Sequence, residues 1–195
     1  ANRPFMSPQF QAFTRNRVGF DKETLRSAEL GVKTRQMGGQ LALSFAVFYT
    51  QRDNAQLENW MWDEGAGLWV SFLDTSSDAR SAGAELSSQY WVNEQVEVFA
   101  NLGLLVTEVD SLTAFDLDLA AFVTKEDREQ AKSPSYQYNV GVRVHWNDEW
   151  SGHLEVEGQD DSFYGYYHDG KLSSYDLLNE EQNYQFFLNV FQVYD

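Results

Sequence analysis

The chain has 195 residues and a mass of 22.4 kDa, which suits one domain or part of a larger one. It carries 30 acidic residues against 14 Lys and Arg, a formal charge of −16, which disfavours nucleic acid as a partner because phosphate backbones require clustered cations. The absence of cysteine excludes disulfides and zinc–thiolate sites, and the absence of any stretch of about 18 apolar residues excludes a transmembrane helix.

Alternation of apolar and polar residues with a period of two runs through most of the chain and predicts β-strands. In the clearest case, one face of the segment 40–50 is wholly apolar, from Leu41 to Tyr49, while the other face carries Gln40, Ser44 and Thr50. The pattern predicts eight strands, at about 25–35, 40–51, 70–91, 95–107, 135–146, 150–159, 172–183 and 185–195.

The connections between these strands alternate in length. Short ones fall near 37–39, 93–94, 147–149 and 182–183, whereas long ones span about 52–68, 108–134 and 160–171 and hold over half of the excess negative charge. Several strands have about ten residues, enough to cross a bilayer at a tilt. The pattern therefore predicts an all-β fold: a segment of an antiparallel up-and-down transmembrane β-barrel, with about eight strands, short periplasmic turns and long extracellular loops.

Residues at the ends of the apolar rows favour a membrane over a soluble sandwich, whose strands would also alternate. Six aromatic residues lie there, where amphipathic rings suit a membrane interface: Tyr49, Tyr90, Trp91, Tyr136, Trp146 and Trp150. Strand parity then predicts that Lys33, Arg143, Glu155 and Glu157 face the lumen. Arg80 shares its parity with apolar residues, so it fits only if that strand rises above the lipid.

Residues 20–33 read F-D-K-E-T-L-R-S-A-E-L-G-V-K. This segment resembles the F-D-P-E-T…E-L-G-x-K stretch of the TonB-dependent outer-membrane receptor family. Residues 79–86 resemble its A-x-x-x-G-x-E-L strand, and 99–103 its next upward strand. Residues 174–179 resemble its s-Y-x-l-x-N segment, while 192–195 are similar to N-L-F-D with Gln192 in place of the usual Asn.

The resemblance implies that residues 1–195 are part of a receptor β-barrel domain, from its C-terminal portion, without the plug domain and the last strand. It further implies uptake of a scarce nutrient, most often a ferric siderophore or similar iron complex, across the outer membrane of a Gram-negative bacterium. TonB would act through the absent plug, while outer-membrane lipid and lipopolysaccharide would surround the wall. Eight strands of a 22-stranded barrel would form an open sheet, which we expect to be unstable alone.

Two long loops combine aromatic rings with carboxylates, which can stack on sugar or catechol rings and accept their hydroxyl hydrogen bonds. The candidate ligand-binding residues are Trp60, Trp62 and Trp69 in the first loop and Tyr164, Tyr166, Tyr167 and His168 in the third. Packing of one loop against another is the competing interpretation.

The sequence predicts no enzymatic site, metal site or cofactor. His145, His153 and His168 lie on different strands or loops without metal-ligand spacing, and Glu155 with Glu157 suits two solvated acids better than a catalytic pair. Two other functional classes remain open: an autonomous eight-stranded outer-membrane barrel with a structural or adhesive role, and a soluble carbohydrate-binding β module.

Overall fold

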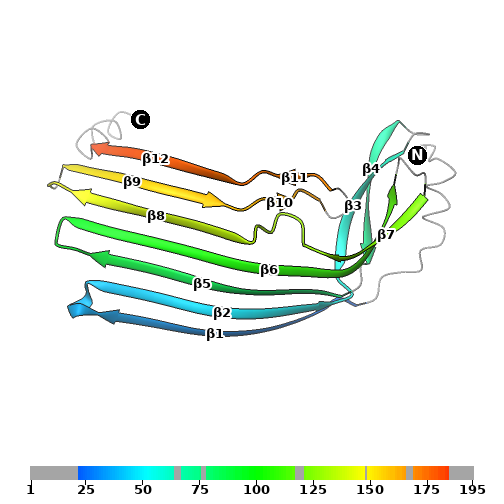
Figure 1. The fold of residues 1–195 in the computed structure, drawn as a ribbon, viewed down its shortest axis with the longest axis horizontal. Coiled ribbons are helices and arrows are strands. Elements are labelled where there is room, and N and C mark those ends of the chain that lie inside the picture. The colour runs from blue at the N-terminus through cyan, green and yellow to red at the C-terminus, as the bar shows by residue number, and fades with distance from the viewer. Residues whose placement is uncertain are drawn as a thin grey trace, which may run out of the picture.

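The computed structural model describes residues 22–63, 67–75, 78–116, 121–147, 149–165 and 169–184. They form an antiparallel sheet in the order β1-β2-β5-β6-β8-β9-β12, with β7 paired to the far part of β6 (Figure 1). The strands are β1 (Thr24–Gln36), β2 (Leu41–Asp53), β5 (Ala79–Trp91), β6 (Val96–Asp116), β7 (Ala121–Arg128), β8 (Tyr136–His145), β9 (Trp150–Gln159) and β12 (Tyr175–Tyr184). The predicted fold class is confirmed.

The two ends of the sheet differ. Short turns join strands at one end, while the other end carries the hairpin β3–β4 (Gln56–Asp63 and Leu68–Thr75), strand β7, and the small hairpin β10–β11 (Ser162–Phe163 and Lys171–Leu172) (Figure 1). A single 3-10 turn, η1 (Met37–Gly39), is the only helical element among the described residues, and no described helix is long and apolar enough to cross a membrane.

Local chemistry explains the short turns. At η1, Gly38 and Gly39 have φ of 69° and 100°, a left-handed backbone that glycine adopts without steric cost. At the turn before β6, the Asn93 side-chain oxygen accepts the backbone N–H groups of Gln95 (2.8 Å) and Val96 (2.9 Å). Asn147 does the same before β9, so side-chain amides close both turns.

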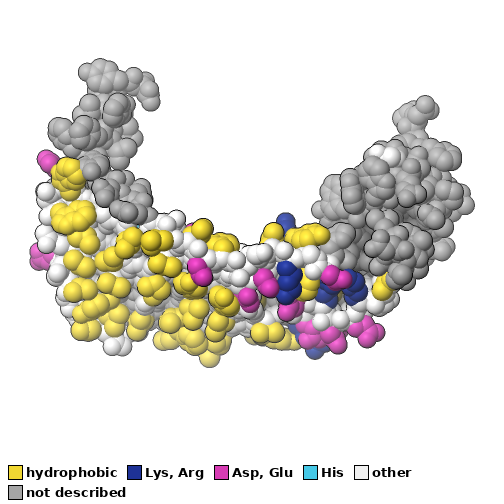
Figure 2. All heavy atoms as spheres, turned by 45° about the horizontal axis from the view of Figure 1, so that its top comes forward, with side chains coloured by type: hydrophobic (Ala, Val, Ile, Leu, Met, Phe, Trp, Pro, Cys, Tyr) yellow, Lys and Arg dark blue, Asp and Glu magenta, His cyan; other side chains and the backbone are white. Residues whose placement is uncertain are grey.

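The register separates the side chains into two faces. Leu30 lies opposite Val47, Val47 opposite Ala84, and Ala84 opposite Leu104, so apolar residues share one face across four strands. This apolar face is exposed: Leu30 retains 75% and Val106 73% of its accessible surface. In Figure 2, hydrophobic side chains gather over the end of the sheet with the short turns, and charged ones lie toward the other end.

Few described residues are buried. Ala55, Ala79, Val109 and Leu112 form a small cluster at the end with the long connections. Within the part of the chain that the structure describes, no second layer covers the apolar face, so its side chains require an apolar medium outside the sheet to be removed from water.

Three differences from the sequence prediction stand out. The strand expected over 70–91 is two strands, because β4 pairs with β3 in a separate sheet while β5 begins at Ala79. The loop expected over 108–134 contains the extension of β6 to Asp116 together with β7. Likewise, the loop expected over 160–171 contains β10 and the start of β11. The strand expected over 185–195 lies outside the described residues.

Arg80 shares its side of the strand with apolar residues, which would place a charge against lipid. It lies at the second position of β5, near the end with the long connections. Its guanidinium pairs with Asp110 (2.7 Å) and Glu108 (3.3 Å). The ion pairs place Arg80 among charged residues and away from the apolar part of its strand.

Candidate functional site

The face opposite the apolar one is polar and forms the candidate site. Its central feature is one register row across six strands, which we call the polar row: Lys33, Ser44, Ser87, Asn101, Asn139 and Glu157. Arg143 and Glu155 also lie on this face, opposite Glu97 and Gly141 respectively. The four residues expected to face the lumen therefore share one face of the sheet.

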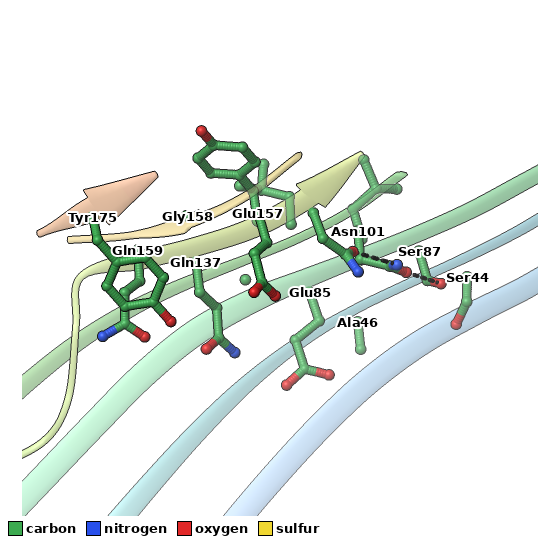
Figure 3. Close-up of a pocket in the computed structure, with 15 residues that line it drawn as sticks. Ser44, Ala46, Glu85, Ser87, Asn101, Gln137, Glu157, Gly158, Gln159 and Tyr175 are labelled. Carbon is green, nitrogen blue, oxygen red and sulfur yellow. Dashed lines mark hydrogen bonds between the residues drawn. The ribbon is translucent and has the colours of Figure 1, made fainter. Parts of the chain in front are cut away.

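Hydrogen bonds connect the central residues of the polar row, from β5 to β8. Ser87 Oγ donates to Asn101 Oδ1 (2.5 Å) (Figure 3), and Asn101 Nδ2 donates to Asn139 Oδ1 (2.7 Å). Asn139 Nδ2 then donates to Glu155 Oε1 on β9 (2.8 Å). Because each amide has a partner on both sides, the row presents a fixed pattern of donors and acceptors.

A pocket of about 390 Å³ opens beside the polar row. Figure 3 shows the carboxylates of Glu85 and Glu157 extending into it, with the amides of Gln137 and Gln159 nearby. No cation among the described residues pairs with Glu85, and the side chain of Gln137 lies over Gly103, the register partner of Glu85 on β6. The pocket is therefore acidic and accepts hydrogen-bond donors such as hydroxyl or N–H groups.

A second hollow, of about 310 Å³, lies on the same face nearer the short turns. Lys33 and Arg35 line it together with Ser44, Ser87 and Gln89. The polar face thus presents cations of β1 at this second hollow, and carboxylates of β5 and β9 at the first pocket.

A buried carboxylate anchors the polar face on β6. Glu97 is only 4% exposed and accepts hydrogen bonds from Gln89 (2.8 Å) and Arg143 (3.0 Å). The Arg143 guanidinium lies 4.3 Å from the centre of the Phe99 ring, and the centre of the His153 ring lies 5.5 Å from that of Phe99. Glu97 was not among the candidate site residues predicted from the sequence. Its position between Val96 and Val98, which face the apolar side, was the signal that places it on the polar face.

His153 extends this cluster toward β9. Its Nε2 lies 3.0 Å from Glu155 Oε2, at an angle that makes no hydrogen bond. Among the described residues, no three His, Asp or Glu side chains gather where they could hold a metal ion.

The predicted ligand-binding residues that the structure describes lie at the opposite end from the short turns. Trp60 and Trp62 belong to β3 and Trp69 to β4, and the register places Trp62 opposite Trp69. Tyr164 follows β10 and is about half exposed, next to Gly170. The other three candidates, Tyr166, Tyr167 and His168, lie outside the described residues. Their role in binding stays a prediction.

Glu23, just before β1, is linked to β2 by an ion pair and to the β3–β4 hairpin by a hydrogen bond. The Glu23 carboxylate accepts the backbone N–H of Gln56 (2.9 Å) and pairs with Arg52 (2.8 Å). The Gln56 hydrogen bond, followed by Arg52, lowers the pKa of Glu23. Glu23 therefore stays ionised and holds the hairpin near the end of β2.

The sheet is antiparallel and has one apolar and one polar face, with short turns at one end and long connections at the other. These are the features of a wall segment of a β-barrel. The family model described as TonB dependent receptor-like, beta-barrel, matches residues 2–191. The chain belongs to this family.

A search of solved structures found a similar fold in a protein named "Copper transporter OprC". The two chains are 14% identical with a TM-score of 0.63, over 85% of this chain and 24% of that one. This chain therefore spans about a quarter of the length of that transporter.

Proposed function

We propose that this chain forms part of the wall of an outer-membrane transporter in a Gram-negative bacterium, energised through TonB. The observation that carries the proposal is the family match over residues 2–191 on a sheet whose two faces differ in polarity. The apolar face would contact outer-membrane lipid, and lipopolysaccharide would contact the charged end. The polar face would line the lumen, where a plug domain would connect the wall to TonB.

The proposed substrate is a ferric siderophore or a similar iron complex. Aromatic hairpins above a polar wall suit a bulky ligand with hydroxyl groups, and the pocket beside Glu85 and Glu157 accepts hydrogen-bond donors. Copper is the second candidate, because the protein with the similar fold is named a copper transporter. At 14% identity that likeness extends to the fold, so the two substrates require a direct comparison.

An uptake assay tests both parts of the proposal. Cells that carry or lack the gene would be incubated with radioactive iron bound to a panel of siderophores, or with radioactive copper, in strains with and without TonB. We expect iron accumulation that disappears in either deletion. If only copper uptake depends on TonB and on the gene, copper is the substrate in place of an iron complex. Unchanged uptake of every compound would reject the transport function.

The two other functional classes receive less support. A soluble carbohydrate-binding module would leave side chains such as Leu30 and Val106 in water. An autonomous eight-stranded barrel needs its first and last strands to pair, whereas β1 and β12 lie at opposite edges of the described sheet (Figure 1).

An immunoblot of an outer-membrane fraction distinguishes these classes. We expect a band several-fold heavier than 22.4 kDa. A membrane band near 22.4 kDa would favour the autonomous barrel, and absence from the membrane would favour the soluble module.

A further inference from the structure

Two long connections meet at the end of the sheet away from the short turns. The β6–β8 connection contains β7, and the β9–β12 connection contains the hairpin β10–β11. Asp169 of the second connection accepts hydrogen bonds from two cations of β7, Lys125 Nζ (2.6 Å) and Arg128 Nη1 (2.8 Å). One carboxylate thus joins both connections.

Phe163 of β10 provides a second link. The Arg128 guanidinium lies 4.3 Å from the centre of its ring, and Lys171 of the same hairpin lies 4.8 Å from it. The backbone oxygen of Phe163 also accepts the N–H of Lys132 (2.7 Å), which follows β7. Phe163 is therefore held by one backbone and one cation–π contact from the other connection.

Exposed ion pairs usually contribute little, because water screens them and two long side chains must be ordered. This arrangement differs in that Arg128 is only 8% exposed and uses one guanidinium for both Asp169 and Phe163. Asp169 is 78% exposed, yet its hydrogen bonds from Lys125 and Arg128 lower its pKa to about 2. The carboxylate therefore keeps its charge at every physiological pH.

We propose that β7 and the hairpin β10–β11 form one mechanical unit, the clasp, held by Asp169, Arg128 and Phe163. A displacement of either connection is then transmitted to the other, because separating them breaks the shared contacts. In a transporter whose loops approach a ligand, contact with one connection would reposition both. The inference goes beyond the proposed transport function, and its test requires no transport.

Hydrogen exchange on the full-length receptor in detergent tests the clasp. In Asp169→Ala, we expect amide exchange over 121–128 to rise about threefold or more, although the substitution lies in the other connection. Because coupling is reciprocal, Arg128→Gln should raise exchange over 162–172. The heat-modifiable gel mobility of the barrel should stay unchanged in both variants, which separates loss of the clasp from loss of folding.

Asp161→Ala is the matched control. It removes an ion pair with Lys171 (2.9 Å) that lies within the β9–β12 connection. Exchange over 121–128 should match that of the unmodified receptor. The proposal is overturned if Asp169→Ala affects its own connection alone, or if Asp161→Ala raises exchange over 121–128 to the same extent.

Discussion

Two glycines on the polar face lie beneath phenylalanine rings. Gly83 is the register partner of Phe48, and Gly141 that of Phe99. A Cβ at Gly141 would overlap the Phe99 ring and lie 2.7 Å from the backbone oxygen of Leu154. The missing side chain therefore allows the ring to lie flat against the neighbouring strand.

We expect Gly141→Ala to destabilise the full-length receptor by about 1–3 kcal/mol, because a backbone oxygen cannot move aside as a flexible side chain can. The measurement is the midpoint of urea unfolding in detergent. Gly103→Ala is the control: its nearest neighbour is Gln137 Cγ at 3.3 Å, so the midpoint should shift less. Equal shifts for the two variants would contradict this explanation.

The buried carboxylate of Glu97 depends on Arg143. Arg143→Leu would leave Glu97 with Gln89 as its remaining side-chain donor, and we expect a loss of about 1–3 kcal/mol of stability. Lys33→Gln, at an exposed cation of the same face, should change stability by less than about 0.5 kcal/mol. Unfolding in urea provides both values, and an unaffected Arg143→Leu variant would show that water replaces the lost donor.

Asp169 gives the clasp a defined pH dependence. Its pKa in the folded chain is about 2, below its ordinary value of 3.8, so its stabilising contribution is complete above pH 3.8 and disappears as the pH falls through about 2. Spin labels at Glu126→Cys and Leu172→Cys would report the separation of the two connections. We expect a constant distance from pH 7 to 4.5 and an increase toward pH 2. An increase already between pH 7 and 5 would assign the response to another group.

At the scale of elements, the sequence predicted the strands of the sheet better than the hairpins above it. In β2 or β8, one face of the strand requires apolar residues and the other requires polar residues. The resulting period-two alternation can be recognised in the sequence without a structure. The hairpins β3–β4 and β10–β11 pair with themselves above the sheet, where nothing imposes a constant face. Their residues therefore looked like loops, or like the start of β5.

The candidate site was likewise predicted from the sequence only in part. Parity placed Lys33, Arg143, Glu155 and Glu157 on one face, because every second residue of a strand shares a face. Parity could not show the hydrogen bonds from Ser87 to Glu155, or the buried position of Glu97. Both depend on the register between strands, which is set by turns far from these residues in the sequence.

The apolar face predicts how much a strand is destabilised when a charged residue is introduced on it. Leu102 lies on that face in the part of β6 that pairs with both β5 and β8, so Leu102→Arg should lower stability in lipid vesicles by about 2–4 kcal/mol. Met37→Arg, at the exposed η1 turn, should cost about 0–1 kcal/mol because the turn lies beyond the apolar band. Reversible unfolding from vesicles measures the difference, and equal effects would contradict a lipid-facing β6.

At the scale of the whole molecule, the described strands form a curved sheet that is not closed. We expect residues 22–184, expressed alone and refolded in detergent, to aggregate, because edge strands with unpaired N–H and C=O groups recruit other chains. Size-exclusion chromatography measures this outcome. A monodisperse monomer with a sharp unfolding transition would show that the segment is self-sufficient.

The register of the polar row also has a geometric consequence. Strands of outer-membrane barrels tilt by roughly 35–45° from the barrel axis, and neighbours are about 4.8 Å apart, so a row perpendicular to the strands shifts along the axis by roughly 3 Å per strand. From Lys33 on β1 to Glu157 on β9 the row makes five such steps. It would then wind along the wall as a ramp of roughly 15 Å. A solute travelling along the axis would meet the Lys33 ammonium and the Glu157 carboxylate at different depths, one after the other.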